Sequence, residues 1–346
     1  MSTIRQGGEM HGKTRTARRL GVLLAAMLAL HGAQAAAQAS ARFSYHWAVD
    51  HESAVMSKKY AEEVNRRGAG KIRIDSFPGG QLYTIRQILP ALSAGSVELG
   101  GVVTHNQFPS VERDWNVVQF PNVFESIEHQ RRFFAETPEG SALRARILKK
   151  TGLVHLAYVP TGPYVTFSVK SDMSTVASMK GLKARTLAPA ERAGFVARGA
   201  SVVSLSTEEI YTALQSGMID TLTTVPTAAK AFSWFDFLKY AQLPAAVYTD
   251  AAVMANGKWF AALPKEVQSL LLEVGADISR EATESTYRSN DQALKEFAAR
   301  GGRITALKGA QLEEFLRLDR EKTEPEMAKG VSPEIYAALR RYIGRK

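Results

Sequence analysis

The sequence has no cysteine among its 346 residues, and this absence excludes several chemistries. Disulfide bonds, thiolate nucleophiles and cysteine-ligated zinc or iron–sulfur clusters all require cysteine. A chain of this length with 45% hydrophobic residues can bury sizeable cores, and it is long enough for two domains. We therefore expect a fold that is held by packing and not by cross-links.

The sequence also lacks the patterns that mark common active sites. His46 and His51 are the closest pair of its seven histidines, and no H-E-x-x-H or comparable carboxylate cluster accompanies them. A G-x-S-x-G nucleophile elbow is absent. The stretch "GAGK" at residues 68–71 has Ile72 where a phosphate loop needs Ser or Thr, and it precedes a strand-like segment, so it is a turn. We expect no metal, no cofactor and no catalytic residue.

Apolar runs long enough for a membrane anchor, about 20 residues, are not evident. The apolar run at residues 20–30 follows four basic residues and precedes two A-x-A patterns at 33–35 and 37–39. This combination predicts a cleaved secretory signal peptide over residues 1–39. Arg18 and Arg19 are also compatible with twin-arginine export, although the residues after them fit that pattern poorly.

The excess of positive charge is modest once the signal peptide is removed. The formal net charge is +10, and residues 1–39 hold five basic residues and one acidic residue, so cleavage leaves about +6. Such an excess does not call for nucleic acid as a partner. It weakly favours the approach of small anions.

From Phe43 the chain alternates strand-like and helix-like segments. Helical spacing covers residues 52–68, and residues 83–95 show it with Pro90 shortening the pattern. The strand-like segments are residues 43–48, 71–77, 97–103, 152–159, 164–169, 182–187, 200–205 and 218–225. This alternation predicts an α/β fold with parallel sheets.

The last third of the chain is helical in pattern. We expect one long helix over residues 264–300 and two more over 309–318 and 332–343. The predicted organisation is two α/β lobes joined by this region. The first lobe covers 40–160 and is completed by parts of 248–300; the second covers 161–247 and is completed by 301–346.

Two features of the segment from 181 to 220 bear on function. Ser206 and Glu209 form a capping-box pattern, so Glu208 and Glu209 are interpreted as capping and solvent-facing residues, not as a catalytic pair. Arg185 lies in the strand-like "GLKARTL" and has two interpretations. It is either a solvated side chain at a sheet edge or a carboxylate ligand, because ligands bind outside the carboxyl ends of strands in open α/β sheets.

Three segments together resemble one protein family. They are "GGQLYTIRQILPALSAGSVELGGV", then "GLKARTL" with "ARGASVVSLSTEEIYTALQSGMID", and then "MANGKWFAALPKEVQSLLLE". In this order, and within a match from about Phe43 to the end of the chain, they resemble the substrate-binding proteins of TRAP transporters, the DctP-like family.

The resemblance implies a fold, a place and a function. The fold is a two-lobe periplasmic-binding-protein type II fold with a long C-terminal helix that spans both lobes. The protein would be a periplasmic receptor that closes on a small organic acid anion and delivers it to the TRAP membrane permease subunits. The arginine that matches Arg185 usually binds the ligand carboxylate in this family.

The chain also departs from the family pattern. Many members have D-G-x-x-N-P after the signature aspartate, whereas here Asp220 begins "DTLTTVP", so Thr223 or Thr224 is the expected hydroxyl substitute for the asparagine. Some members carry a second arginine on the strand that holds Tyr164 here, and its absence leaves a monocarboxylate or a dicarboxylate open as the ligand.

Several further residues are candidates for the cleft, and each also has a packing interpretation. They are His46, Trp47, His51, Thr104, His105, Asn106, Tyr164 and Trp234. Two other functions stay open at this point. One is an exported enzyme that acts on a small carboxylate in the same cleft, and the other is a binding protein that serves a sensor or a different transporter.

Overall fold

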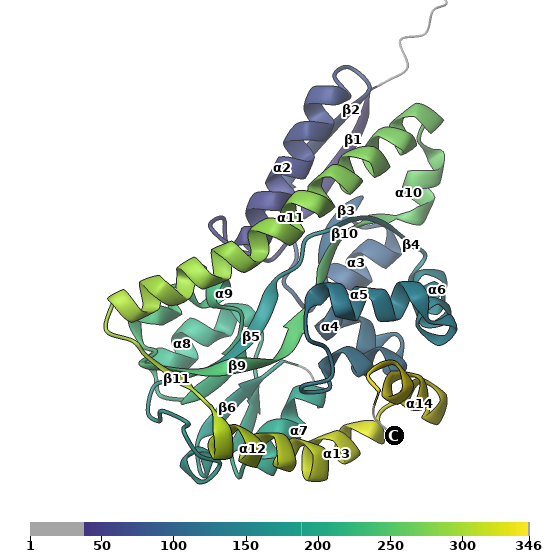
Figure 1. The fold of residues 1–346 in the computed structure, drawn as a ribbon. Helices are drawn as coiled ribbons and strands as arrows, with labels where there is room; N and C mark the ends of the chain where they lie inside the picture. Colours follow the sequence, from purple (N-terminus) through teal and green to yellow (C-terminus); the bar gives the residue numbers. More distant parts are fainter. Residues whose placement is uncertain (1–37, 188, 345–346) are drawn as a thin grey trace, which may run out of the picture. The chain divides into compact units, whose positions relative to one another are not determined.

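The computed structural model describes residues 38–187 and 189–344 (Figure 1). The predicted signal peptide lies outside these residues except for its last two positions. Within the described ranges, no helix combines the length and the apolar character needed to cross a bilayer.

Two β-sheets organise the chain from Ala39 onward, one in each lobe (Figure 1). The first sheet has five strands, in the order β2 (Ile72–Phe77), β1 (Ala39–Ser44), β3 (Leu99–Val103), β10 (Ala251–Asn256) and β4 (Leu153–Tyr158). The second has six, in the order β11 (Arg303–Ala306), β9 (Tyr240–Thr249), β5 (Gly162–Ser168), β8 (Thr221–Thr224), β6 (Lys183–Thr186) and β7 (Ser201–Ser204). The expected α/β fold with two lobes is confirmed.

The sheets are mixed in strand direction, so the expectation of parallel sheets was wrong in part. β10 runs antiparallel between β3 and β4, and β5 is antiparallel to both β8 and β9. β9 and β10 are also strands that the sequence pattern did not reveal. They follow each other directly and belong to different sheets, so the chain returns to the first lobe and enters its sheet in the reverse direction.

The helices begin and end close to where local sequence signals place them. α2 ends at a cap on Gly68, and the Ser206–Glu209 capping box is present. The α-helices are α2 (Glu52–Arg67), α3 (Ile88–Ala94), α4 (Thr104–Gln107), α5 (Ile127–Glu136), α6 (Pro138–Thr151), α7 (Pro189–Ala197), α8 (Ile210–Gln215), α9 (Pro226–Ala231), α10 (Gly257–Ala262), α11 (Lys265–Ala299), α12 (Gly309–Leu318), α13 (Glu324–Ala328) and α14 (Pro333–Tyr342). Pro90 lies within α3, which is correspondingly short.

The long helix α11 spans both lobes, as expected (Figure 1). Its 35 residues correspond to a length of about 50 Å. It packs on α2 and β4 in the first lobe and on α9, β5 and β11 in the second. α11 therefore forms a continuous strut along both lobes.

Each lobe has its own apolar core on the two faces of its sheet. In the first lobe, Tyr60 and Leu271 belong to one cluster and Phe133 and Leu143 to another. In the second lobe, Phe167 and Trp234 belong to one cluster and Met179 and Phe315 to the other. Each sheet is therefore covered by apolar side chains on both of its faces.

The end of the chain differs from one expected domain boundary. Residues 301–346 were expected to complete the second lobe, and β11 and α12 do pack there. In contrast, Ile335 and Leu339 of α14 pack with Phe133 and Leu143 of the first lobe. The apolar face of α14 is buried against α5 and α6, so the chain crosses back before it ends. The other predicted bounds of the lobes stay predictions.

A buried asparagine on α11 forms hydrogen bonds to the backbone where the chain crosses between the lobes. Asn290 donates from Nδ2 to the carbonyl of Thr161 (3.0 Å), and its Oδ1 accepts from the backbone N–H of Thr227 (3.2 Å). Gly162, at the start of β5, has φ +121°, and a Cβ atom there would lie 2.4 Å from Asn290 Nδ2. Glycine is therefore required where the chain passes from the first sheet to the second.

Candidate functional site

Arg185 is buried inside the second sheet and is not at its edge. Its strand β6 lies between β8 and β7, with Arg185 in register with Leu222 and Val203. Only 5% of the residue is exposed. The interpretation of Arg185 as a solvated edge residue is therefore wrong.

The guanidinium of Arg185 has an incomplete set of partners. Its Nε donates to the carbonyl oxygen of Leu205 at 3.0 Å. Its Nη2 is buried and has no hydrogen-bond partner among the described residues. Burial lowers the pKa of Arg185, and the nearby carboxylate of Glu191 offsets part of this effect. A buried cation with a free donor is a strong attractor for an anion.

Arg185 faces a small cavity with walls from both lobes, which we call the arginine cavity. Its volume is about 40 Å³. The lining residues are His46, Trp47, His51, Ile85, Val103, His105, Asn106, Thr161, Tyr164, Arg185, Leu187, Thr207, Thr224, Val225, Ala228, Phe232 and Trp234. The cavity is thus built where the two sheets meet.

The structure brings most of the predicted site residues together in this cavity. Those that line it are Arg185, His46, Trp47, His51, His105, Asn106, Tyr164, Thr224 and Trp234. Two candidates lie elsewhere. Thr223 lines a neighbouring cavity, with its Oγ1 at 3.3 Å from that of Thr166. Thr104 faces the first lobe, where its hydroxyl donates to the carbonyl of Asp250.

The histidines of the arginine cavity are neutral at physiological pH. Burial lowers the pKa of His46, His51 and His105 to about 3 in each case. His51 also has a structural role, because its Nδ1 accepts from the N–H of Ser53 and caps α2. The positive charge of this cavity therefore comes from Arg185.

Trp47 is positioned by a close approach between its loop and β3. Its ring is stacked near His51, with 6.2 Å between centroids. A Cβ atom on Gly101 would lie 2.4 Å from Cζ3 of Trp47, so glycine at this position of β3 makes room for the indole. The "GGVV" segment thus shapes the apolar wall of the site.

A chain of polar contacts crosses between the lobes beside the cavity. His105 Nε2 lies 2.7 Å from the hydroxyl of Tyr164. Asn106 Nδ2 donates to Glu191 Oε1 at 2.8 Å, and Glu191 Oε2 accepts from the N–H of Leu187 at 2.7 Å. α4 of the first lobe is therefore joined to β5 and α7 of the second, and the lobes are in contact around Arg185.

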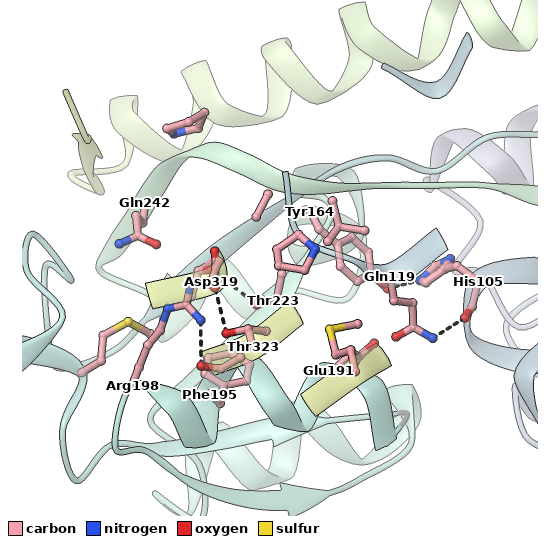
Figure 2. Close-up of a pocket in the computed structure, with 18 residues that line it drawn as sticks. His105, Gln119, Tyr164, Glu191, Phe195, Arg198, Thr223, Gln242, Asp319 and Thr323 are labelled. Carbon is pink, nitrogen blue, oxygen red and sulfur yellow. Dashed lines mark hydrogen bonds and ion pairs between the residues drawn. The ribbon is translucent and has the colours of Figure 1, made fainter. Parts of the chain in front are cut away.

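A second cavity, of about 120 Å³, shares His105 and Tyr164 with the arginine cavity (Figure 2). Its lining consists of His105, Gln119, Pro121, Tyr164, Thr166, Met179, Glu191, Gly194, Phe195, Arg198, Thr223, Gln242, Pro244, Ala246, Val247, Asp319, Thr323 and Met327. Arg198 and Asp319 in its wall pair with each other at 2.7 Å. The two cavities are thus neighbours that share a wall formed by Tyr164 and His105.

Sequence reasoning missed three polar residues of this region. Glu191 and Gln119 line the second cavity, and each lies in a segment without a recognisable motif. Glu208 is exposed, as interpreted, and its side chain also accepts from the N–H of Ile85 across the lobes at 3.2 Å. A carboxylate five residues after the end of β6, in the first turn of α7, is the only local signal for Glu191.

The arrangement is suited to holding an anion. It offers one buried guanidinium with a free donor, neutral histidines and an aromatic wall. In the part of the chain that the structure describes, no group of three or more His, Asp or Glu residues gathers as a metal site would need.

Comparison with known proteins identifies related chains. A 2,3-diketo-L-gulonate-binding periplasmic protein of Escherichia coli is 25% identical over 251 residues, which is 72% of this chain and 76% of that protein. A C4-dicarboxylate-binding periplasmic protein of Rhodobacter capsulatus is 25% identical over 333 residues, which is 94% of this chain and 98% of that protein.

Solved structures share the fold. DctP7 of Bordetella pertussis, a solute receptor that binds pyroglutamic acid, has a TM-score of 0.80 and 19% identity, with 88% of this chain and 99% of that chain covered. A TRAP periplasmic solute-binding protein of Shewanella oneidensis with bound succinate has a TM-score of 0.81 and 19% identity, with 89% and 100% covered. The model of the bacterial extracellular solute-binding proteins, family 7, matches residues 43–329. The chain therefore belongs to this family, the DctP-type receptors of TRAP transporters.

Proposed function

We propose that this protein captures a small organic acid anion in the periplasm, with the ligand carboxylate bound by Arg185 and the two lobes closed around it. It then delivers the acid to the membrane permease subunits of a TRAP transporter. The observation that carries the proposal is the buried Nη2 of Arg185, which has no partner among the described residues and lies in the wall of an interlobe cavity.

The carboxylate is the anion that fits this cation best. A guanidinium presents a planar pair of donors that matches the two oxygens of a carboxylate. Burial disfavours the charge of Arg185 and lowers its pKa, so an anion that enters the cavity compensates the buried positive charge. The related proteins that bind diketogulonate and C4-dicarboxylates also take carboxylic acids, which supports the proposal.

One ion pair is not enough for tight binding. A micromolar dissociation constant corresponds to about 8 kcal/mol, whereas one charged hydrogen-bonded contact supplies about 1.5–3 kcal/mol. The remainder must come from burial and from further hydrogen bonds. The contacts of Asn106 with Glu191 and of Ile85 with Glu208 join the two lobes, and they support a site that closes around its ligand.

The proposal is tested by calorimetric titration of the mature protein with mono- and dicarboxylates. The Arg185→Gln variant should bind about 10- to 100-fold more weakly to any acid that binds the wild-type protein, because it loses the charged contact. Arg192 provides a matched control, since it is exposed on α7 and its replacement by Gln removes the same charge.

Two outcomes would contradict the proposal. If no acid in a broad panel binds the wild-type protein, it is not an organic acid receptor. If an acid binds equally well to wild type and Arg185→Gln, the protein is a receptor but Arg185 is not its anchor.

A further inference from the structure

The charges that line the two cavities cancel. Arg198 and Asp319 form an ion pair at 2.7 Å. The remaining charged side chains in the lining are the guanidinium of Arg185 and the carboxylate of Glu191. The three histidines add no charge, because burial lowers their pKa to about 3. One bound carboxylate therefore brings the lined space to a net charge of −1, and a second would bring it to −2.

Glu191 is a carboxylate that no cation neutralises within salt-bridge distance in the described structure. Its oxygens accept instead from two amide groups, Asn106 Nδ2 at 2.8 Å and the N–H of Leu187 at 2.7 Å. It lines the second cavity, which shares the side chains of Tyr164 and His105 with the arginine cavity. A second ligand carboxylate that extends in this direction would meet Glu191, and two like charges in a buried site repel strongly.

Gln119 provides an acceptor in the same cavity. Gln119 is 5% exposed. Its Nε2 donates to the carbonyl of His105 at 2.7 Å, which fixes the orientation of the amide. Its Oε1 is buried without a hydrogen-bond partner in the described residues. Figure 2 shows this amide with its oxygen on the side of Glu191. A buried acceptor of this kind calls for a donor on the ligand.

We propose that the ligand is a monocarboxylate that carries at least one hydrogen-bond donor, and that Gln119 and Glu191 select it. Its carboxylate binds Arg185, its donor faces Gln119 Oε1 or Glu191, and its carbon body lies against Phe195, Met179 and Met327. This inference rests on the proposed function. Hydroxyl, amide and ring N–H groups satisfy it, whereas dicarboxylates do not.

The test uses three sets of acids of increasing size. Each set contains a donor-bearing monocarboxylate, a monocarboxylate of similar size without a donor, and a dicarboxylate. The sets are lactate, propionate and malonate; pyroglutamate, cyclopentanecarboxylate and succinate; and galacturonate, cyclohexanecarboxylate and galactarate. Dissociation constants are measured by calorimetry for wild type, Arg185→Gln, Glu191→Gln and Gln119→Met.

In each set that binds in an Arg185-dependent way, the donor-bearing monocarboxylate should bind at least about tenfold tighter than either companion. Glu191→Gln should reduce the ratio between the dissociation constants of the dicarboxylate and the donor-bearing monocarboxylate, because it removes the negative charge that repels the second carboxylate. Glu284→Gln removes an exposed carboxylate from α11 and should leave this ratio unchanged within about twofold. Gln119→Met should reduce the ratio between the dissociation constants of the two monocarboxylates. A merely structural disturbance would instead weaken the binding of both monocarboxylates by the same factor.

The two proposals fail in different ways. Tighter Arg185-dependent binding of a dicarboxylate, equal binding of the two monocarboxylates, or a ratio of dicarboxylate to monocarboxylate dissociation constants that Glu191→Gln leaves unchanged would overturn the monocarboxylate inference and keep the receptor. Binding that survives Arg185→Gln would keep the receptor but overturn both the role of Arg185 and this inference. No binding by any of the acids would overturn the proposed function and this inference with it.

Discussion

Replacement of Arg185 by methionine should separate the stability of this protein from its binding. Methionine keeps a long side chain but removes a charge that burial disfavours, as the lowered pKa of Arg185 shows. A buried polar group left unpaired destabilises a protein by about 1–3 kcal/mol, or more when it is charged. The variant loses the hydrogen bond from Nε to Leu205, which is worth about 1 kcal/mol.

These two terms predict that the ligand-free variant is between equally stable and about 2 kcal/mol more stable than the wild-type protein. An ordinary truncation in a core lowers the free energy of unfolding by about 2–5 kcal/mol, so the two cases are easy to tell apart. Glu191 offsets part of the burial penalty of Arg185, so the expected gain in the free energy of unfolding lies in the lower part of this range.

Urea unfolding followed by circular dichroism, with and without a bound acid, measures both effects. An acid at 100 times its dissociation constant should add about 2.7 kcal/mol to the wild-type protein and nothing to the variant. A ligand-free variant that is more than 2 kcal/mol less stable than wild type would refute the reasoning, because Arg185 would then be a satisfied structural cation.

Three further changes test the frame of the site. Gly162→Ala, at φ +121° and with its Cβ 2.4 Å from Asn290 Nδ2, should lower the free energy of unfolding by at least about 1–3 kcal/mol, and an unchanged urea midpoint would contradict this. Asn290→Ala should lower it by about 1–3 kcal/mol for each buried group left unpaired at Thr161 and Thr227, which the same assay measures. Because the native pKa of His46 is about 3 against 6.5 in the unfolded chain, the unfolded chain binds the extra proton, and stability falls as the pH drops below 6.5. His46 alone should account for about 2 kcal/mol of this loss at pH 5, and His46→Gln should remove that share while His51 and His105 keep theirs; equal pH dependence in both proteins would be evidence against a neutral buried His46.

Some elements could be predicted from the sequence because their signals are local. The apolar spacing and Gly68 cap of α2, the Ser206–Glu209 capping box and the length of α11 all depend on residues within a few turns of one another. The succession of strands and helices was equally visible. Strand direction was not, because β9 and β10 pair with strands that lie far away in the sequence.

The candidate site shows the same division. Arg185 could be named as a candidate from its position near the end of a strand, and the family resemblance strengthened this. Whether its guanidinium is exposed or buried depends on which elements pack above it, and these come from both lobes. Glu191 and Gln119 carried no motif, since their importance lies in the cavity that they share with Tyr164.

The sequence by itself thus determined the class of fold and the family, and it identified Arg185 as a candidate anchor, because periodicity, caps and a few motif residues are encoded locally. Only the tertiary structure decided that the Arg185 guanidinium is buried with a free donor, that the surrounding histidines are neutral, and that a carboxylate and an unpaired amide oxygen line a cavity that also contains Tyr164. The physical reason is that burial and charge balance are properties of the space between the lobes, and residues from about 46 to 327 meet there only after the chain has folded.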